Sequence, residues 1–115
     1  MANTFKVITK AGVTSLDVIY TVARSTTTVV LGLVSGNTTG SQVTSTVTLT
    51  TDTAARAGAN DEANQAVELV TNAPIPAGSS LELLAGNKVV LETTDEIKVS
   101  ARGAVDVALS VMEIT

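Results

Sequence analysis

Short runs of alternating apolar and polar residues recur along the chain, about one every ten residues. In the clearest run, residues 42–51, Val43, Val47 and Leu49 share one side and threonines occupy the other. Because side chains alternate across a β-strand with a period of two, such a run predicts a strand with one buried and one solvated face. Glycine-containing turn segments separate the runs, and no run has the helical period. This pattern predicts closely spaced antiparallel strands.

Composition supports the same fold class. The chain of 115 residues contains 19 threonines and 17 valines, nearly a third of the total. β-Branched side chains lose rotamer freedom in a helix and pack well on a pleated sheet. We therefore predict an all-β protein, a single domain over residues 1–115, folded as an antiparallel β-sandwich of Ig-like or jelly-roll type with about eight strands. The expected strands are residues 5–10, 16–23, 26–35, 42–51, 67–70, 80–84, 88–92, 96–101 and 104–114.

The alternation also predicts which side chains form the core between the two sheets. The expected core residues are Val18, Leu31, Leu33, Val47, Leu49, Leu69, Leu81, Leu83, Leu91, Ile97, Val99, Val107 and Leu109.

Two of the expected strands carry apolar residues on the face that should meet water. In residues 26–35, Val30 and Val34 lie opposite the predicted core face, and in the last strand Met112 and Ile114 fall on an otherwise polar face. In the last strand, this placement of apolar residues on the polar face indicates either a bulge or an apolar contact. Only 16% of the residues are charged, whereas a free surface more typically carries about 25–35%. These four residues are the candidate interface residues, and we expect a homo-oligomer or larger assembly.

The amino acids that are absent exclude several kinds of site. The chain has no histidine, cysteine or tryptophan. Zinc, haem, iron–sulfur and copper sites built on histidine or cysteine are therefore impossible, as are Ser–His and Cys–His nucleophile pairs. We expect no enzyme, no catalytic residue, no metal and no cofactor.

Carboxylates are the remaining candidates for acid–base or metal chemistry. Asp95 and Glu96 follow Glu92 in a predicted tight turn, where a calcium or paired-carboxylate site is one interpretation and a polar turn the other. In the polar turn, Asp95 accepts hydrogen bonds from backbone N–H groups. Asp61 and Glu62 lie in a long charged segment that lacks the spacing of a calcium loop.

Further features of the sequence concern possible partners and location. Residues 52–64 form either a hairpin loop or one short helical turn, and a connection of this length is often functional. Tyr20 is expected in the core or an interface rather than in a ligand site.

The seven basic residues form no cluster, and the chain has only two aromatic residues, so nucleic acid is not an expected partner. No apolar run is long enough for a membrane span, and no signal peptide is expected.

Three short segments resemble small virion structural proteins of tailed bacteriophages. They are Ala73-Pro74-Ile75-Pro76-Ala77-Gly78-Ser79-Ser80-Leu81, Asn87-Lys88-Val89-Val90-Leu91-Glu92 and Asp95-Glu96-Ile97-Lys98-Val99. The opening residues 1–5 and the closing residues 108–115 are similar as well.

This resemblance implies a compact β-sandwich without catalytic residues, located in a virion that is assembled in the host cytoplasm. The implied role is capsid decoration or cement, and the alternative is a neck or tail accessory protein. The implied partners are further copies of the chain and the major capsid, neck or tail proteins. A receptor- or carbohydrate-binding module is the other class to consider, although two aromatic residues equip the chain poorly to stack on sugars.

Overall fold

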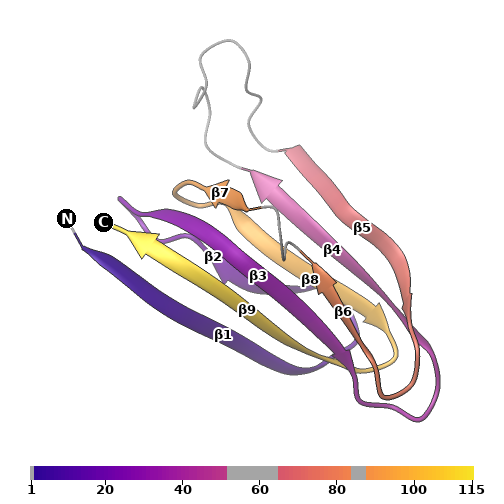
Figure 1. Cartoon of the computed structure of the whole chain (residues 1–115). Coiled ribbons are helices and arrows are strands. Elements are labelled where there is room, and N and C mark those ends of the chain that lie inside the picture. The colour runs from indigo at the N-terminus through magenta and orange to yellow at the C-terminus, as the bar shows by residue number, and fades with distance from the viewer. Residues whose placement is uncertain (1, 52–64, 84–87) are drawn as a thin grey trace.

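The computed structural model describes residues 2–51, 65–83 and 88–115, which form nine β-strands and no helix (Figure 1). The all-β prediction is therefore confirmed. The strands are β1 (Asn3–Val13), β2 (Asp17–Thr21), β3 (Thr27–Asn37), β4 (Val43–Thr51), β5 (Gln65–Ile75), β6 (Ser80–Leu83), β7 (Val89–Leu91), β8 (Glu96–Arg102) and β9 (Val105–Ile114).

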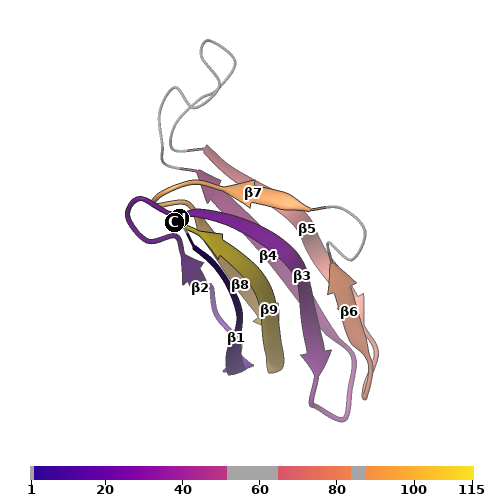
Figure 2. The same ribbon diagram turned by 60° about the vertical axis from the view of Figure 1, so that its left-hand side comes forward.

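The strands form two antiparallel sheets that pack face to face (Figures 1 and 2). Sheet A has the order β1-β9-β3-β6, and the short strand β7 pairs with the same edge of β3 as β6 does. Sheet B has the order β2-β8-β4-β5. The edges are therefore β1 and the β6–β7 pair in sheet A, and β2 and β5 in sheet B.

The segment around the two prolines differs from the prediction. Residues 67–70 were expected as a short strand, but β5 continues through Pro74 to Ile75. Pro74 pairs with Thr44 of β4. Proline lacks an N–H and is tolerated in a sheet at an edge, and β5 is the edge of sheet B.

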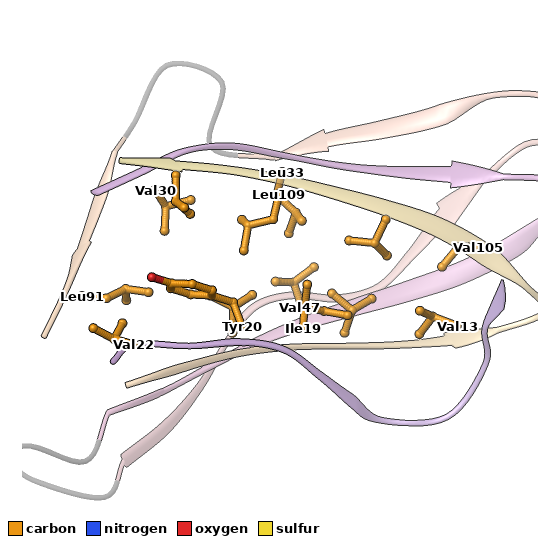
Figure 3. Packing of buried hydrophobic residues seen from close by; sticks show 14 of the residues in the cluster. Val13, Ile19, Tyr20, Val22, Val30, Leu33, Val47, Leu91, Val105 and Leu109 are labelled. Carbon is orange, nitrogen blue, oxygen red and sulfur yellow. The ribbon is translucent and has the colours of Figure 1, made fainter. Parts of the chain in front are cut away.

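The core lies between the sheets, where inward-facing residues of both layers meet (Figure 3). Leu33, Leu109, Val47, Ile97 and Val99 are each at most 1% exposed. Leu91 and Val107 are also buried, and Leu49, Leu69, Leu81 and Leu83 pack partly buried against the cluster. Burial of apolar side chains at about 25 cal/mol per Å² makes this layer the main source of stability.

Two of the expected core residues are not in the core, and a β-bulge explains each. The register of β2 with β8 shifts between Val18 and Tyr20, so Ile19 and Tyr20 are both buried while Val18 is 41% exposed. The register of β3 with β9 shifts between Val30 and Gly32, which takes Leu31 out of the core cluster. A bulge adds one residue to one strand, and the alternation after it is reversed.

No bulge accounts for the apolar residues at the end of the chain. The register of β9 with β1 is unbroken from Asn3–Ile114 to Lys10–Val107. Alternation therefore continues to the end of β9, with Met112 and Ile114 on the outer face and Glu113 pointing inward. The bulge interpretation of this segment is wrong.

Asn37 joins the two sheets at the end of β3. Its amide nitrogen donates to the carbonyl oxygens of Ser41 (2.8 Å) and Ile75 (2.9 Å). Its Oδ1 accepts hydrogen bonds from the backbone N–H (2.8 Å) and the hydroxyl (2.7 Å) of Thr39. One buried side chain thus shapes the turn after β3 and ties it to β5.

The predictions for residues 52–64, including Asp61 and Glu62, lie outside the described residues.

Candidate functional site

A row of apolar side chains crosses the outer face of sheet A, on the side away from the core. Met112 of β9 pairs with Phe5 of β1 and with Val29 of β3, and Val29 pairs in turn with Val90 of β7. Paired residues of an antiparallel sheet lie on the same face. Phe5 is 70% exposed and Val90 58% exposed, so the side chains at both ends of this row are exposed.

Neighbouring rows extend this apolar region along the strands. Ile114 pairs with Asn3 and Thr27 in one row, and Val7 pairs with Ser110 in the next. We call the whole set the outer patch, and it comprises Phe5, Val7, Val29, Leu31, Val34, Val90, Met112 and Ile114. Among the described strand residues of this face, the charged ones are Glu82 and Asp106. Glu82 pairs with Val34 at the border of the outer patch, and Asp106 lies beyond it, toward the other end of the strands.

The outer face of sheet B has a different chemistry. Thr44, Thr46, Thr48 and Thr50 of β4 face outward, as the alternation predicted, and they pair with charged or polar residues of β8. These β8 residues are Arg102, Ser100, Lys98 and Glu96. One face of the sandwich is therefore suited to water, and the other carries a contiguous apolar patch of the kind that marks interaction surfaces.

The four interface candidates from the sequence do not all lie on this face. Val34, Met112 and Ile114 belong to the outer patch, and Val34 is 39% exposed. Val30 is 0% exposed and packs in the core, so the expectation that it points outward is wrong. The bulge at Leu31 separates Val30 from Val34 by one extra residue, so the two valines face opposite sides.

A polar cluster closes one end of the core, next to the row that carries Met112. The hydroxyl of Tyr20 donates to Oε2 of Glu113 (2.6 Å), and Tyr20 and Thr28 hydroxyls lie 2.7 Å apart. The ammonium group of Lys6 lies 2.8 Å from Oε1 of Glu113. Figure 3 shows the Tyr20 ring lying between the two layers. The sequence did not identify Glu113 as a member of this cluster, because its role depends on its side chain pointing inward from β9.

The cluster shifts the pKa values of both of its acidic groups. Burial, followed by the hydrogen bond to Glu113, raises the pKa of Tyr20 to about 12. The hydrogen bonds from Lys6 and Tyr20 lower the pKa of Glu113. The carboxylate is thus held charged by two donors, and its role is to satisfy the buried phenol.

The contacts of Tyr20 and Asp95 stabilise the fold. Tyr20 belongs to the core cluster, which agrees with the expectation of a core or interface position. Asp95 is buried, and its Oδ2 accepts a hydrogen bond from the backbone N–H of Glu92 (3.0 Å). The polar-turn interpretation of Asp95 is confirmed.

The part of the chain that the structure describes holds no pocket and no group of three or more acidic residues that is suited to a metal ion. The same residues include no helix with the length and apolar character needed to cross a membrane.

No protein-family model matches the chain, and a search of curated proteins found no match. Among solved structures, the chain is similar to one from Bacillus endospore appendages, which are described as a novel family of disulfide-linked pili. The two chains are 14% identical, with a TM-score of 0.45, and the match covers 97% of this chain and 83% of the other.

Proposed function

We propose that this chain is a non-enzymatic structural subunit that attaches to a larger assembly through the outer patch of sheet A. The observation that carries the proposal is the row Phe5–Met112–Val29–Val90, which places four apolar side chains across four strands on a surface-facing side. Burying such a row against a partner is favourable because its apolar area leaves water.

The size of the outer patch indicates how attachment works. Four strands at a spacing of about 4.8 Å and six residues at about 3.4 Å each give a flat area of about 400 Å². A stable specific interface needs about 800 Å² per partner. One patch therefore supports a modest contact, and firm attachment comes from repeating that contact over many identical subunits.

The setting we propose is the virion of a tailed bacteriophage, with capsid decoration or cement as the role. This part of the proposal rests on the resemblance of residues 73–81, 87–92 and 95–99 to small virion proteins. A neck or tail accessory protein is the alternative within the same setting. The partners in either case are further copies of the chain and the capsid, neck or tail proteins.

A carbohydrate- or receptor-binding module receives no specific support. The chain has one phenylalanine and one tyrosine, and Tyr20 is buried in the core. Phe5 lies in the outer patch among aliphatic side chains, without a recess in which a sugar ring could stack.

Sedimentation tests the proposal. The purified chain should sediment with concentration-dependent association, and it should pellet with phage capsids, or with necks or tails if the alternative role is correct. A chain that remains monomeric at all concentrations and pellets with none of these particles would contradict the proposal.

A further inference from the structure

The edges of the two sheets differ in how well they are protected against pairing with another strand. Strands β6 and β7 contain four and three residues, and β2 contains five with a bulge. The long edge strand β5 has two register shifts against β4, a residue with positive φ at Asn72 (48°), and Pro74. Short length, bulges and proline are the usual means of blocking an edge.

The edge strand β1 lacks these features over most of its length. Its register with β9 is unbroken from Asn3 to Lys10, and Gly12 (φ 68°) and the register shift come after that segment. An edge strand of this kind presents a row of backbone N–H and C=O groups that another strand can pair with.

The two lysines of β1 are the feature that would oppose pairing, and each is neutralised within its own chain. Lys6 contacts Glu113 of β9 at 2.8 Å, and Lys10 contacts Asp17 of β2 at 3.3 Å. Both lysines lie on the inward side of sheet A, because they pair with Val111 and Val107. The outward side of the same strand carries Phe5 and Val7.

We propose that β1 pairs with β1 of a second copy of this chain, antiparallel and with Val7 opposite Val7 on a two-fold axis. Such a pair would join two A sheets edge to edge, with both outer patches on the same face. This inference rests on the proposed function, because it states how the outer patch reaches the size of a stable interface. Doubling about 400 Å² gives about the 800 Å² that a stable contact requires.

The charges on β1 exclude the two neighbouring registers. Side-chain alternation requires outward residues of one copy to lie opposite outward residues of the other. The two-fold axis must therefore pass through a residue that lies opposite its own equivalent, and not between two residues. Centring on Lys6 places the two Lys6 side chains opposite each other, and centring on Ile8 places Lys6 opposite Lys10. Like charges directly opposite are destabilising. The Val7 register instead places Lys6 opposite Ile8 and Lys10 opposite Thr4, and it pairs residues 4–10 in full.

The second copy also fits the outward side of the strand. In this register Phe5 lies opposite Thr9 of the second copy, and Val7 lies opposite its equivalent. Aromatic and β-branched residues are favourable cross-strand neighbours. The lysines of the two copies meet only diagonally, at about 7–8 Å, and each keeps its own carboxylate partner.

Single cysteines test the register, because the chain has no cysteine of its own. With Val7→Cys the two sulfurs fall opposite each other, within the Cα separation of about 4.4–6.8 Å that a disulfide allows. With Phe5→Cys or Thr9→Cys the two equivalent residues are about 14 Å apart, four residues along the strand. Glu68→Cys, on the exposed side of β5, is the control for random collision.

Under mild oxidation, Val7→Cys should form a covalent dimer roughly tenfold faster or more than Phe5→Cys, Thr9→Cys or Glu68→Cys, because pairing raises the effective concentration of the thiols. A mixture of Phe5→Cys and Thr9→Cys should cross-link, although neither does so alone. Equal rates for Val7→Cys and the three other variants would overturn the inference.

If equal rates occur while the chain still sediments as an assembly, the edge pairing is wrong and the proposed function stands. If Val7→Cys cross-links rapidly while the chain binds no particle, the edge pairing stands and the virion role fails.

Discussion

The phenolic oxygen of Tyr20 lies 2.6 Å from Oε2 of Glu113, which ties β2 of sheet B to the last strand of sheet A. The two residues are 93 positions apart in the chain. Glu113 is an inward-facing charge, and burying it is possible because Tyr20 and Lys6 both donate to it. The same strand then presents Met112 and Ile114 outward, so the polar cluster and the outer patch are two consequences of one alternation.

The titration of Tyr20 should reflect this contact. The chain has one tyrosine and no tryptophan, so ultraviolet absorbance follows Tyr20 alone. The folded protein should titrate at about pH 12, well above the ordinary value near 10. Glu113→Gln should lower the midpoint part of the way, because burial remains. A midpoint near 10 with the circular dichroism of the folded protein unchanged would contradict the contact.

Acid should weaken the fold through Glu113. Its pKa is lower in the folded protein than the ordinary value of 4.5, so its stabilising effect is complete above about pH 4.5 and is lost as the pH falls through the folded pKa. Denaturant unfolding at a series of pH values should show a smaller acid loss for Glu113→Gln than for the unmodified chain. Glu82→Gln, at an exposed position of β6, is the matched control and should leave the acid loss unchanged.

Two glycines should respond oppositely to alanine. Gly103 has a φ of 94°, and a Cβ there would lie 2.3 Å from Cγ1 of Val43. Gly103→Ala should lower the free energy of unfolding by about 1–3 kcal/mol, from backbone strain and the clash. A Cβ on Gly32 meets nothing within 4 Å, so Gly32→Ala should be neutral or slightly stabilising. Urea unfolding compares the two, and equal losses would contradict the placement of Gly103.

Removing the Asn37 side chain should lower the free energy of unfolding. Asn37→Ala leaves the Ile75 carbonyl and the Thr39 N–H without this partner. The Ser41 carbonyl keeps the hydrogen bond that the Thr39 hydroxyl donates to it (2.8 Å). The expected loss is about 2 kcal/mol or more, because buried polar groups left unpaired cost about 1–3 kcal/mol each. Thr39→Ala, which removes a half-buried hydroxyl from the same turn, should cost less. A neutral Asn37→Ala variant in thermal unfolding would show that this side chain does not join the sheets.

The sequence predicted the positions of all nine strands because period-two alternation and turn residues are local signals. It could not place the bulges, since one extra residue at Ile19 or Leu31 leaves the composition of the strand unchanged. Val18, Val30 and Leu31 were assigned to the wrong side for that reason. The contact between Tyr20 and Glu113 depends on how the two sheets stack, which alternation within a strand does not report. Met112 and Ile114 were found because the sequence shows apolar residues at positions of the last strand that are otherwise polar.

Sedimentation velocity of two variants tests whether the outer patch of sheet A attaches this chain to its assembly. Met112→Asp places a charge in the middle of the patch, and Val18→Asp places one on the outer face of sheet B, where Val18 is 41% exposed and pairs with Lys98. Both variants should keep the circular dichroism of the unmodified chain. Met112→Asp should weaken binding to the particle on the order of tenfold, a loss of about 1.4 kcal/mol, while Val18→Asp binds as before. Equal binding of the two variants, or a greater loss with Val18→Asp, would contradict this role of the outer patch.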